Sequence, residues 1–270
     1  RVCEDLACLG TTALLLPARD LSLRRVESTS REYEQMRLGT LAKMAAGDYQ
    51  CVVACADAAA QFTLPPDMLL RRTLRLREGT PLPCGNLSAA LVSAGYERCD
   101  QIEGPGQFSV RGGIIDVYPA DCLSPVRLEL WGDTLDTISY FDLLTQRRTE
   151  GLKEVAITPA AEIVYDDAEE LAGAIEALAA GLRGRGAAAQ KENLLADSER
   201  LRAGGQPASL DKYIPLIFDR PATLFEYARG AMVFVSELSR VKERMRTFQW
   251  QLQEDVKTLL ERGELDGSCG

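Results

Sequence analysis

The N-terminal part of the chain alternates short apolar runs with a helical pattern. Residues 12–16 and 51–55 are continuous apolar runs, which are typical of buried strands. Between them, Thr29 and Glu32 have the spacing of a capping box, and apolar residues then recur at helical spacing as far as Gly47. These apolar positions are Tyr33, Met36, Leu41 and Met44. Strand, helix and strand on this scale predict part of a parallel α/β sheet.

From Gln107 onward the apolar period changes to two, which is the pattern of half-buried strands. Gly112-Gly113 interrupts this alternation and indicates a bulge or tight turn, whereas Gly132-Asp133 fits a two-residue hairpin. The strands predicted in this way are 107–111, 114–117, 126–131, 134–141 and a last one near 155–157, after a turn around 145–148. Together they predict a small, mostly antiparallel β domain.

The C-terminal part has a helical pattern. Acidic residues at 166–170 and Arg183 suit the first and last turns of one helix, and a polar helix is predicted at 190–203. Residues 232–235 form a short apolar run that predicts another buried strand, followed by a long helix from near Ser236 to Gly263. Its apolar stripe is formed by Leu238, Val241, Met245, Phe248, Leu252, Val256 and Leu259. We expect this helix to cover a core or to link two domains, because its heptads are too few for a coiled coil.

These patterns predict an α/β fold in three parts. A partial parallel α/β domain is expected at residues 1–80, a small antiparallel β domain at 81–165, and a helical segment that returns to the α/β domain at 166–270. Because the chain starts at Arg1 rather than at methionine, we expect a segment of a larger protein.

Charge argues against nonspecific binding to nucleic acid. The 270 residues include 31 Lys and Arg against 40 Asp and Glu, for a net charge of −9, whereas a phosphate backbone is held mainly by clustered cations. The densest basic run lies at 71–77 and alternates Arg with apolar residues, the pattern of a half-exposed strand. We therefore interpret it as a solvated face, with DNA contact as the alternative.

Composition also excludes several kinds of catalysis. The chain has no histidine, so a Ser-His-Asp or Cys-His arrangement cannot form within it. It has neither a Gly-x-x-x-x-Gly-Lys-Ser/Thr loop nor a Gly-x-Gly-x-x-Gly motif, so we expect no enzyme activity and no bound cofactor in this segment.

Cysteine usage and hydropathy suggest a cytoplasmic protein. The eight cysteines include no C-x-x-C pair, so no metal site is predicted, and Cys51 and Cys55 are interpreted as small buried side chains with reduced thiols. No signal peptide or long apolar span is present, so no membrane partner is expected.

The predicted strand at 126–131 carries unusual residues on its polar face. Val126, Leu128 and Leu130 share the face expected to pack on a core, so Arg127 and Trp131 must point the other way. Arg111 likewise lies opposite the apolar positions of its own predicted strand. Exposed Trp and Arg are the residue types that dominate binding hot spots between proteins. In the alternative interpretation, a neighbouring domain or Tyr140 covers Trp131 and local carboxylates neutralise the arginines.

Three blocks in this region resemble a known family. Residues 106–119, beginning Gly-Gln-Phe-Ser-Val-Arg-Gly-Gly, residues 126–133 (Val-Arg-Leu-Glu-Leu-Trp-Gly-Asp) and residues 141–147 (Phe-Asp-Leu-Leu-Thr-Gln-Arg) are similar to UvrB-type domain 2. That domain is shared by the excision-repair protein UvrB and the bacterial transcription-repair coupling factors. Residues 52–69, with Pro65-Pro66, and residues 213–227 resemble further parts of the coupling factors, so the likeness covers nearly the whole chain.

The resemblance implies a docking module without catalysis of its own. In the family, domain 2 docks the damage-recognition protein UvrA through two arginines and an aromatic residue, which match Arg111, Arg127 and Trp131 here. Phenylalanine is common at the last position, so Trp131 is a departure that keeps an aromatic anchor. The family's complete proteins also bind stalled RNA polymerase and double-stranded DNA through other domains, and an ATP-dependent translocase releases the polymerase. The alternative is a fragment of UvrB itself, which would need a Walker A lysine upstream.

Overall fold

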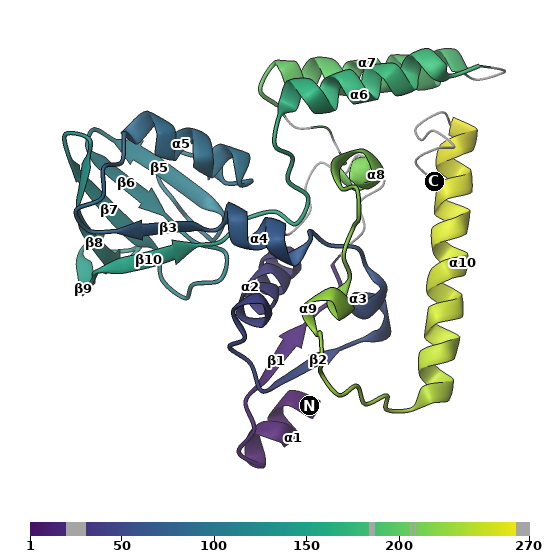
Figure 1. The fold of residues 1–270 in the computed structure, drawn as a ribbon, viewed down its shortest axis with the longest axis horizontal. Helices are drawn as coiled ribbons and strands as arrows, with labels where there is room; N and C mark the ends of the chain where they lie inside the picture. Colours follow the sequence, from purple (N-terminus) through teal and green to yellow (C-terminus); the bar gives the residue numbers. More distant parts are fainter. Residues whose placement is uncertain (20–30, 184–186, 206, 208, 263–270) are drawn as a thin grey trace.

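The chain forms a β-rich unit, an α/β unit and a set of C-terminal helices, seen from left to right in Figure 1. The structure is a computed structural model that describes residues 1–19, 31–183, 187–205, 207 and 209–262. The helices α6 and α7 lie together above the α/β unit, and the long helix α10 stands at the side opposite the β-rich unit. The mixed α/β class predicted from the sequence is confirmed.

The α/β unit contains the first two predicted strands, paired in parallel. Its elements are α1 (Val2–Cys8), β1 (Ala13–Leu16), α2 (Glu32–Ala46), β2 (Cys51–Ala54), α3 (Ala56–Ala60) and α4 (Pro66–Arg72). Leu14 of β1 lies opposite Val52 of β2. The predicted helix between the strands is confirmed as α2, whereas the capping role predicted for Thr29 lies outside the described residues.

Burial in this unit is lower than the apolar runs predict. Within β1 only Leu16 is buried and Leu15 is exposed, while all of β2 is half-buried. The prediction of two fully buried strands is therefore wrong, because this sheet has only two strands among the described residues. Cys51 is half-buried, but Cys55 is exposed at the residue that precedes α3, so it is not the buried side chain that its apolar neighbours predict.

The basic run at 71–77 is divided between two elements. Arg71 and Arg72 end helix α4, and only Arg75 and Arg77 lie on a strand, β3 (Leu74–Arg77). The prediction of a half-exposed strand is thus correct for the second half of the run. It is wrong for the first half, because the helix that begins at Pro66 extends through Arg72.

The β unit is built on a six-stranded sheet in the order β4-β5-β6-β7-β8-β9. Its further elements are α5 (Cys84–Ser93), β4 (Glu97–Arg98), β5 (Gln107–Arg111), β6 (Ile114–Val117), β7 (Val126–Trp131), β8 (Thr134–Phe141), β9 (Arg148–Leu152) and β10 (Glu154–Ile157). All pairs in this sheet are antiparallel except β4 with β5, so the predicted antiparallel character is confirmed. Strand β9 was not predicted, because its sequence Arg-Thr-Glu-Gly-Leu has no apolar alternation.

The two glycine turns place β6 and β7 closely against each other. Gly112 has φ of +61° in the β5–β6 turn, and Gly132 has φ of +61° between the paired residues Trp131 and Thr134. Both turns thus need the left-handed conformation that glycine adopts without strain. At Gly113, an added Cβ would lie 2.9 Å from the backbone oxygen of Leu130, so only glycine permits this approach.

One face of the six-stranded sheet packs on the main apolar core of the β unit. Strands β3 and β10 pair with each other and cover this face together with α5. The buried members of this core are Leu76, Leu87, Leu91, Ala94, Tyr96, Phe108, Ile115, Val117, Val126, Leu128, Leu135, Ile138, Ile157 and Ala160. The alternation predicted for 126–131 is confirmed at Val126 and Leu128, which are fully buried.

The C-terminal helices begin beyond the β unit. They are α6 (Ala168–Gly181), α7 (Ala187–Arg202), the 3-10 turn η1 (Asp211–Tyr213), α8 (Ile214–Ile217), α9 (Leu224–Tyr227) and α10 (Leu238–Arg262). The Asp167 side chain accepts hydrogen bonds from the backbone N–H groups of Glu169 and Glu170, which caps α6. Arg183 does not occupy the last turn of that helix as predicted, because α6 ends at Gly181.

The predicted strand at 232–235 is not formed. Residues Met232 to Val235 have no regular secondary structure, and their side chains are 55–85% exposed. A strand needs a neighbour to pair with, and no strand in the described ranges pairs with this segment. Helix α10 follows as predicted, with Leu259 of its apolar stripe buried and Leu238 exposed.

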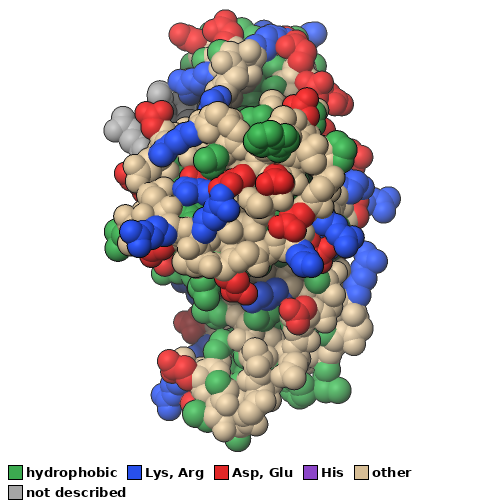
Figure 2. Space-filling model, turned by 90° about the vertical axis from the view of Figure 1, so that its left-hand side faces the viewer, with side chains coloured by type: hydrophobic (Ala, Val, Ile, Leu, Met, Phe, Trp, Pro, Cys, Tyr) green, Lys and Arg blue, Asp and Glu red, His purple; other side chains and the backbone are tan. Residues whose placement is uncertain are grey.

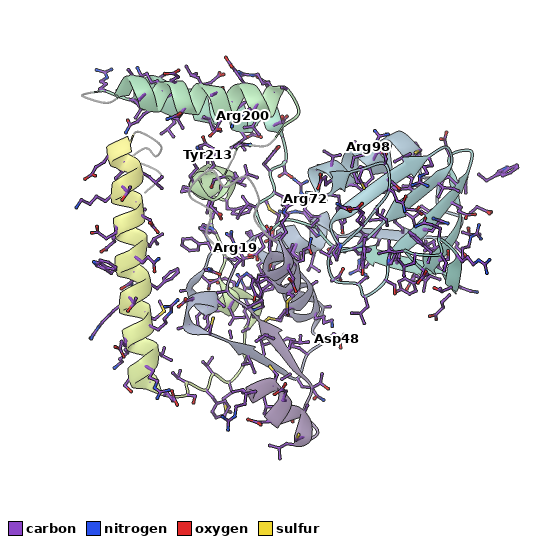
Figure 3. The ribbon with its side chains drawn as sticks, turned by 180° about the vertical axis from the view of Figure 1, so that it is seen from behind. Arg19, Asp48, Arg72, Arg98, Arg200 and Tyr213 are labelled. Carbon is purple, nitrogen blue, oxygen red and sulfur yellow. The ribbon has the colours of Figure 1, made fainter. Side chains whose placement is uncertain are left out.

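Buried charges connect the parts of the molecule. Arg37 on α2 donates from Nε to Glu162 at 2.6 Å, and both side chains are buried. Arg19 donates from Nη2 to Asp211 at 2.5 Å and lies 3.7 Å from Glu162. Figure 3 labels Arg19 between the α/β unit and the helices above it. The network therefore joins α2 to the segment between β10 and α6 and to the turn η1.

Candidate protein-docking surface

The face of the six-stranded sheet opposite the core is called the outer face here. Strand register brings its residues together in two rows, since cross-strand partners share a face. One row runs through Ser109, Asp116, Arg127 and Ser139, and the second through Arg111, Ile114, Glu129 and Thr137. Trp131 lies at the end of β7, beside the turn at Gly132. The β unit therefore gathers the predicted residues Arg111, Arg127 and Trp131 on or beside one face. Figure 2 views this end of the molecule and shows acidic and basic side chains interleaved with isolated apolar ones.

Trp131 projects into solvent. Its side chain is 84% exposed, so neither a neighbouring unit nor Tyr140 covers it. The prediction that this indole faces water is confirmed. A register shift between Glu129 and Leu130 lies just before Trp131, which pairs with Thr134 of β8. An exposed tryptophan on a two-residue hairpin is a rigid apolar contact surface with few torsions to restrict on binding.

Arg111 is also exposed, as predicted. Its Nε and Nη2 groups donate to the backbone oxygen of Asp100 at 3.2 and 2.7 Å. These two bonds hold the side chain against the loop before β5, and among the residues that the structure describes no hydrogen bond or ion pair engages its Nη1 group. Beside it, Ile114 is partly exposed and Glu129 forms an ion pair with Arg148. Arg111 can therefore donate to an external carboxylate without first breaking an ion pair.

Arg127 does not face water as predicted. Its side chain is 14% exposed, and it donates from Nε and Nη2 to both carboxylate oxygens of Asp116 at 2.7 and 2.8 Å. The guanidinium also lies 4.3 Å from the centre of the Phe141 ring. The bidentate bond with Asp116 raises the pKa of Arg127 above its usual value. The alternative interpretation, in which local carboxylates neutralise the arginines, is therefore correct for Arg127.

The missed partner of Arg127 had a signal in the sequence. Asp116 is the single acidic residue within the predicted strand 114–117, and pairing that strand with 126–131 through its alternation would place the two side chains on one face. The second missed partner, Gln146, had no such signal. It reaches Arg127 from the loop after β8, where it accepts a hydrogen bond from Nη1 at its backbone oxygen and one from Nη2 at its side-chain oxygen.

The basic run at 71–77 is less suited to holding phosphate than its density suggests. Arg71 pairs with Asp67, and Arg72 pairs with Asp166 where α4 meets the β unit (Figure 3). Each ion pair neutralises one charge that DNA contact would need. DNA contact through this run stays a hypothesis that no feature of the fold supports.

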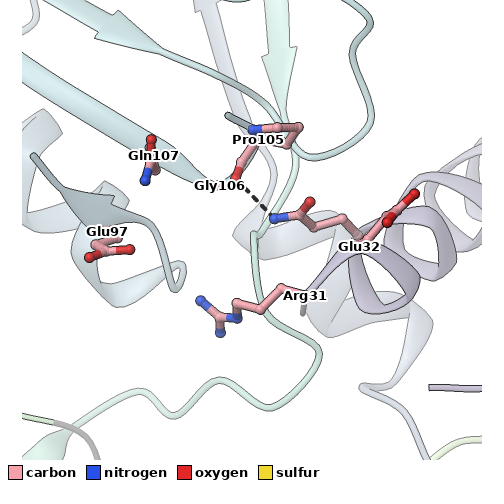
Figure 4. A pocket seen from close by; sticks show the side chains of 7 residues that line it. Arg31, Glu32, Glu97, Pro105, Gly106 and Gln107 are labelled. Atoms are coloured by element: carbon pink, nitrogen blue, oxygen red, sulfur yellow. Dashed lines mark hydrogen bonds between the residues drawn. The ribbon is translucent and has the colours of Figure 1, made fainter. Parts of the chain in front are cut away.

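A groove lies between α2 and the β unit. It has a volume of about 480 Å³ and is lined by residues such as Arg31, Glu32 and Glu97. Across it, Gln35 donates to the backbone oxygen of Pro105 at 3.0 Å, as Figure 4 shows. Arg31 donates to the backbone oxygen of Gly95 at 3.3 Å. These bonds join the two units, so we interpret the groove as part of their contact.

The residues that the structure describes also bear on binding to metal ions and to membranes. Among the residues that the structure describes, no three acidic or cysteine side chains converge in a way that could hold a metal ion. None of the described helices combines the length and the apolar character needed to cross a bilayer. The expectation of a segment without cofactor stays a prediction.

Comparison with known proteins identifies the class of the β unit. Residues 74–163 match the model of the UvrB interaction domain, and these residues contain the whole outer face. The β unit thus belongs to the class of UvrB interaction domains.

The relatives define the family more closely. The transcription-repair-coupling factor of Bacillus subtilis (strain 168) is 33% identical over 276 residues, which cover 98% of this chain and 23% of the relative. Those of Staphylococcus epidermidis (strain RP62A) and Staphylococcus aureus (strain NCTC 8325) are each 25% identical, and the matches cover 92% of this chain and 22% of each relative. The chain belongs to the transcription-repair coupling factor family and corresponds to its N-terminal region. It spans less than a quarter of the length of these relatives, and the alternative of a UvrB fragment is not supported.

Proposed function

We propose that this chain is a non-catalytic docking module that recruits UvrA in transcription-coupled nucleotide excision repair. The observation that carries the proposal is the exposure of both Trp131 and Arg111 on or beside the outer face of a UvrB interaction domain. Such a domain implies a partner of the UvrA type. A solvent-facing indole and an exposed arginine on one side of a sheet have the composition of a binding hot spot.

In the proposed complex, Trp131 fills an apolar pocket of UvrA, and Arg111 donates charge-assisted hydrogen bonds to a UvrA carboxylate. Arg127 belongs to the same predicted set. Because Asp116 and Gln146 already accept its hydrogen bonds, Arg127 has little donor capacity left for a partner. Its contribution must therefore be made mainly through the surface that it supports.

The wider role follows from the family. We propose that the complete protein couples repair to transcription: other domains bind stalled RNA polymerase and double-stranded DNA, and an ATP-dependent translocase releases the polymerase. In this proposal ATP is bound outside the segment described above, the segment itself holds no cofactor, and the protein acts in the cytoplasm.

The test is a Trp131→Ala variant of this chain, titrated with purified UvrA by isothermal calorimetry. We expect binding to weaken by about 2 kcal/mol or more, a change of roughly 30-fold in Kd, because a central aromatic anchor is lost. The melting temperature should not change, because the side chain is 84% exposed and its loss uncovers little of the fold.

Trp250→Ala is the matched control. Trp250 is also exposed, at 63%, but it lies on α10, away from the β unit. Its replacement should leave the affinity for UvrA unchanged. Equal affinities of the wild-type chain and Trp131→Ala for UvrA would refute the proposed surface.

A further inference from the structure

The loop of residues 142–147, between β8 and β9, presents an apolar side chain at its tip. Leu144 is 94% exposed, which makes it one of the most exposed large apolar residues of the β unit. An isolated exposed leucine needs no explanation by itself. This leucine differs because the loop that carries it is held in one conformation by many hydrogen bonds.

Asp142 begins the loop and organises its backbone. Its Oδ1 atom accepts hydrogen bonds from the Thr145 backbone N–H at 2.7 Å and from the Thr145 hydroxyl at 2.8 Å. The Asp142 backbone N–H donates to the oxygen of Arg147 at 2.9 Å, which closes the loop. These bonds define a turn of the kind that Asp commonly initiates.

Gln146 fastens the loop to the outer face. Its side-chain amide donates to the Leu143 oxygen at 2.8 Å, and its two oxygens accept from Arg127 at 3.0 and 3.1 Å. Gln146 has φ of +58°, a left-handed conformation that is unfavourable for a residue with a Cβ atom. Such a conformation persists only where the surroundings hold it, and here Arg127 supplies two of the bonds that do so.

Arg127 thus lies beneath the loop rather than at the surface. It stands between Asp116 of the sheet and Gln146 of the loop, and it covers the buried ring of Phe141. Along β7, Arg127 and Trp131 are separated by four residues, about 13 Å. A standard interface of about 800 Å² per partner is wide enough to include both the loop and Trp131.

We infer that Leu144 is a second apolar anchor for the partner of the outer face, and that Arg127 is a positioning residue that holds the 142–147 loop so that Leu144 reaches this partner. The inference rests on the proposed docking of UvrA, and it commits to a second apolar recess on the same UvrA surface that receives Trp131. It explains why an arginine with internal partners belongs to the predicted binding set.

The experiment measures the affinity of UvrA for the wild-type chain, Leu144→Ala, Gln146→Asn and the double variant. Leu144→Ala should raise Kd roughly tenfold without moving the melting temperature. Gln146→Asn keeps a residue type that tolerates positive φ but is too short to reach both Leu143 and Arg127. It should loosen the loop, speed hydrogen exchange at the Thr145 amide and raise Kd by a similar factor.

The double variant separates positioning from direct contact. If the loop acts by presenting Leu144, then adding Leu144→Ala to Gln146→Asn has little further effect on Kd. Effects that simply multiply would overturn the positioning role. Leu9→Ala, at a leucine after α1 that is 80% exposed, is the matched control and should bind UvrA like the wild type.

Failure of this inference differs from failure of the proposed function. If Trp131→Ala weakens binding and Leu144→Ala does not, the docking surface stands and Leu144 has no part in it. If both variants bind like the wild type, the outer face is not the docking surface. Arg127→Lys adds a readout of its own: it should speed exchange at Thr145 because a lysine cannot form the bidentate and loop bonds together.

Discussion

Arginine side chains take three different roles in this molecule, according to their burial. Arg71 forms an exposed ion pair with Asp67, Arg127 supports a loop from a partly buried position, and Arg37 is buried with Glu162. The guanidinium group is thus solvated in Arg71 and structural in Arg37. Exposed pairs stabilise a fold little, whereas breaking a buried pair leaves a charge without water or partner.

At this scale we predict that Arg37→Met strongly destabilises the chain. The free energy of unfolding should fall by about 3–5 kcal/mol, because Glu162 then keeps a buried charge without its main partner. Urea unfolding followed by circular dichroism measures this change. Arg71→Met is the control and should cost less than about 1 kcal/mol. The double variant Arg37→Met/Glu162→Leu should recover much of the loss. Equal losses of unfolding free energy in Arg37→Met and in Arg71→Met would contradict the prediction.

At the scale of elements, local pattern determined what the sequence could predict. Strands β7 and β8 have the predicted limits, because alternation and the Gly132-Asp133 turn are properties of adjacent residues. The apolar run at 232–235 has the same local signal as β2, but only β2 has a strand beside it.

The candidate site shows the same difference between features that a local pattern predicts and features that depend on distant residues. The alternation placed Trp131 on the polar face of its strand but left open whether a neighbour covers it, and the resemblance to UvrB-type domain 2 favoured the exposure that the structure shows. The burial of Arg127 depends on Gln146, which lies 19 residues away in a loop whose path no periodicity describes. Pairings of this kind follow from tertiary folding and are not encoded in a local pattern.

The 142–147 loop should respond to acid. The hydrogen bond from the Thr145 backbone N–H, followed by that from its hydroxyl, holds the pKa of the Asp142 carboxyl below its usual value of 3.8. A lowered carboxyl pKa means that the loop's extra stability is complete above pH 3.8 and is lost as the pH falls through the lowered pKa.

Nuclear magnetic resonance can follow this transition at the Thr145 amide. We expect its chemical shift to titrate with a midpoint below pH 3.8, and we expect no such titration in Asp142→Asn. A midpoint above 3.8 would show that the carboxylate does not organise the loop.

At the scale of the whole molecule, the β unit has an apolar core of its own. All buried members of that core lie between Leu76 and Ala160, and the α/β unit and the α6–α7 pair have separate clusters. The outer face and the 142–147 loop lie within the same stretch of chain. The domain limits predicted at residues 80 and 165 stay a prediction, and the core suggests that β3 belongs with the β unit.

We therefore predict that a fragment of residues 74–163 folds by itself and binds UvrA as tightly as the whole chain. Thermal unfolding should show one cooperative transition, and calorimetry should give the same Kd within about a factor of two. A fragment of 81–163, which lacks β3, is the control and should unfold at lower temperature because Leu74 and Leu76 leave the core. A disordered 74–163 fragment would show that the core needs the neighbouring unit.

The exposed apolar segment Met232 to Val235 lies far from the outer face of the β unit. It lies in the linker between α9 and α10, away from the six-stranded sheet (Figure 1). The chain therefore exposes apolar side chains at two separate places, one on the β unit and the other along this irregular segment. A partner bound at the outer face would leave Met232 to Val235 uncovered.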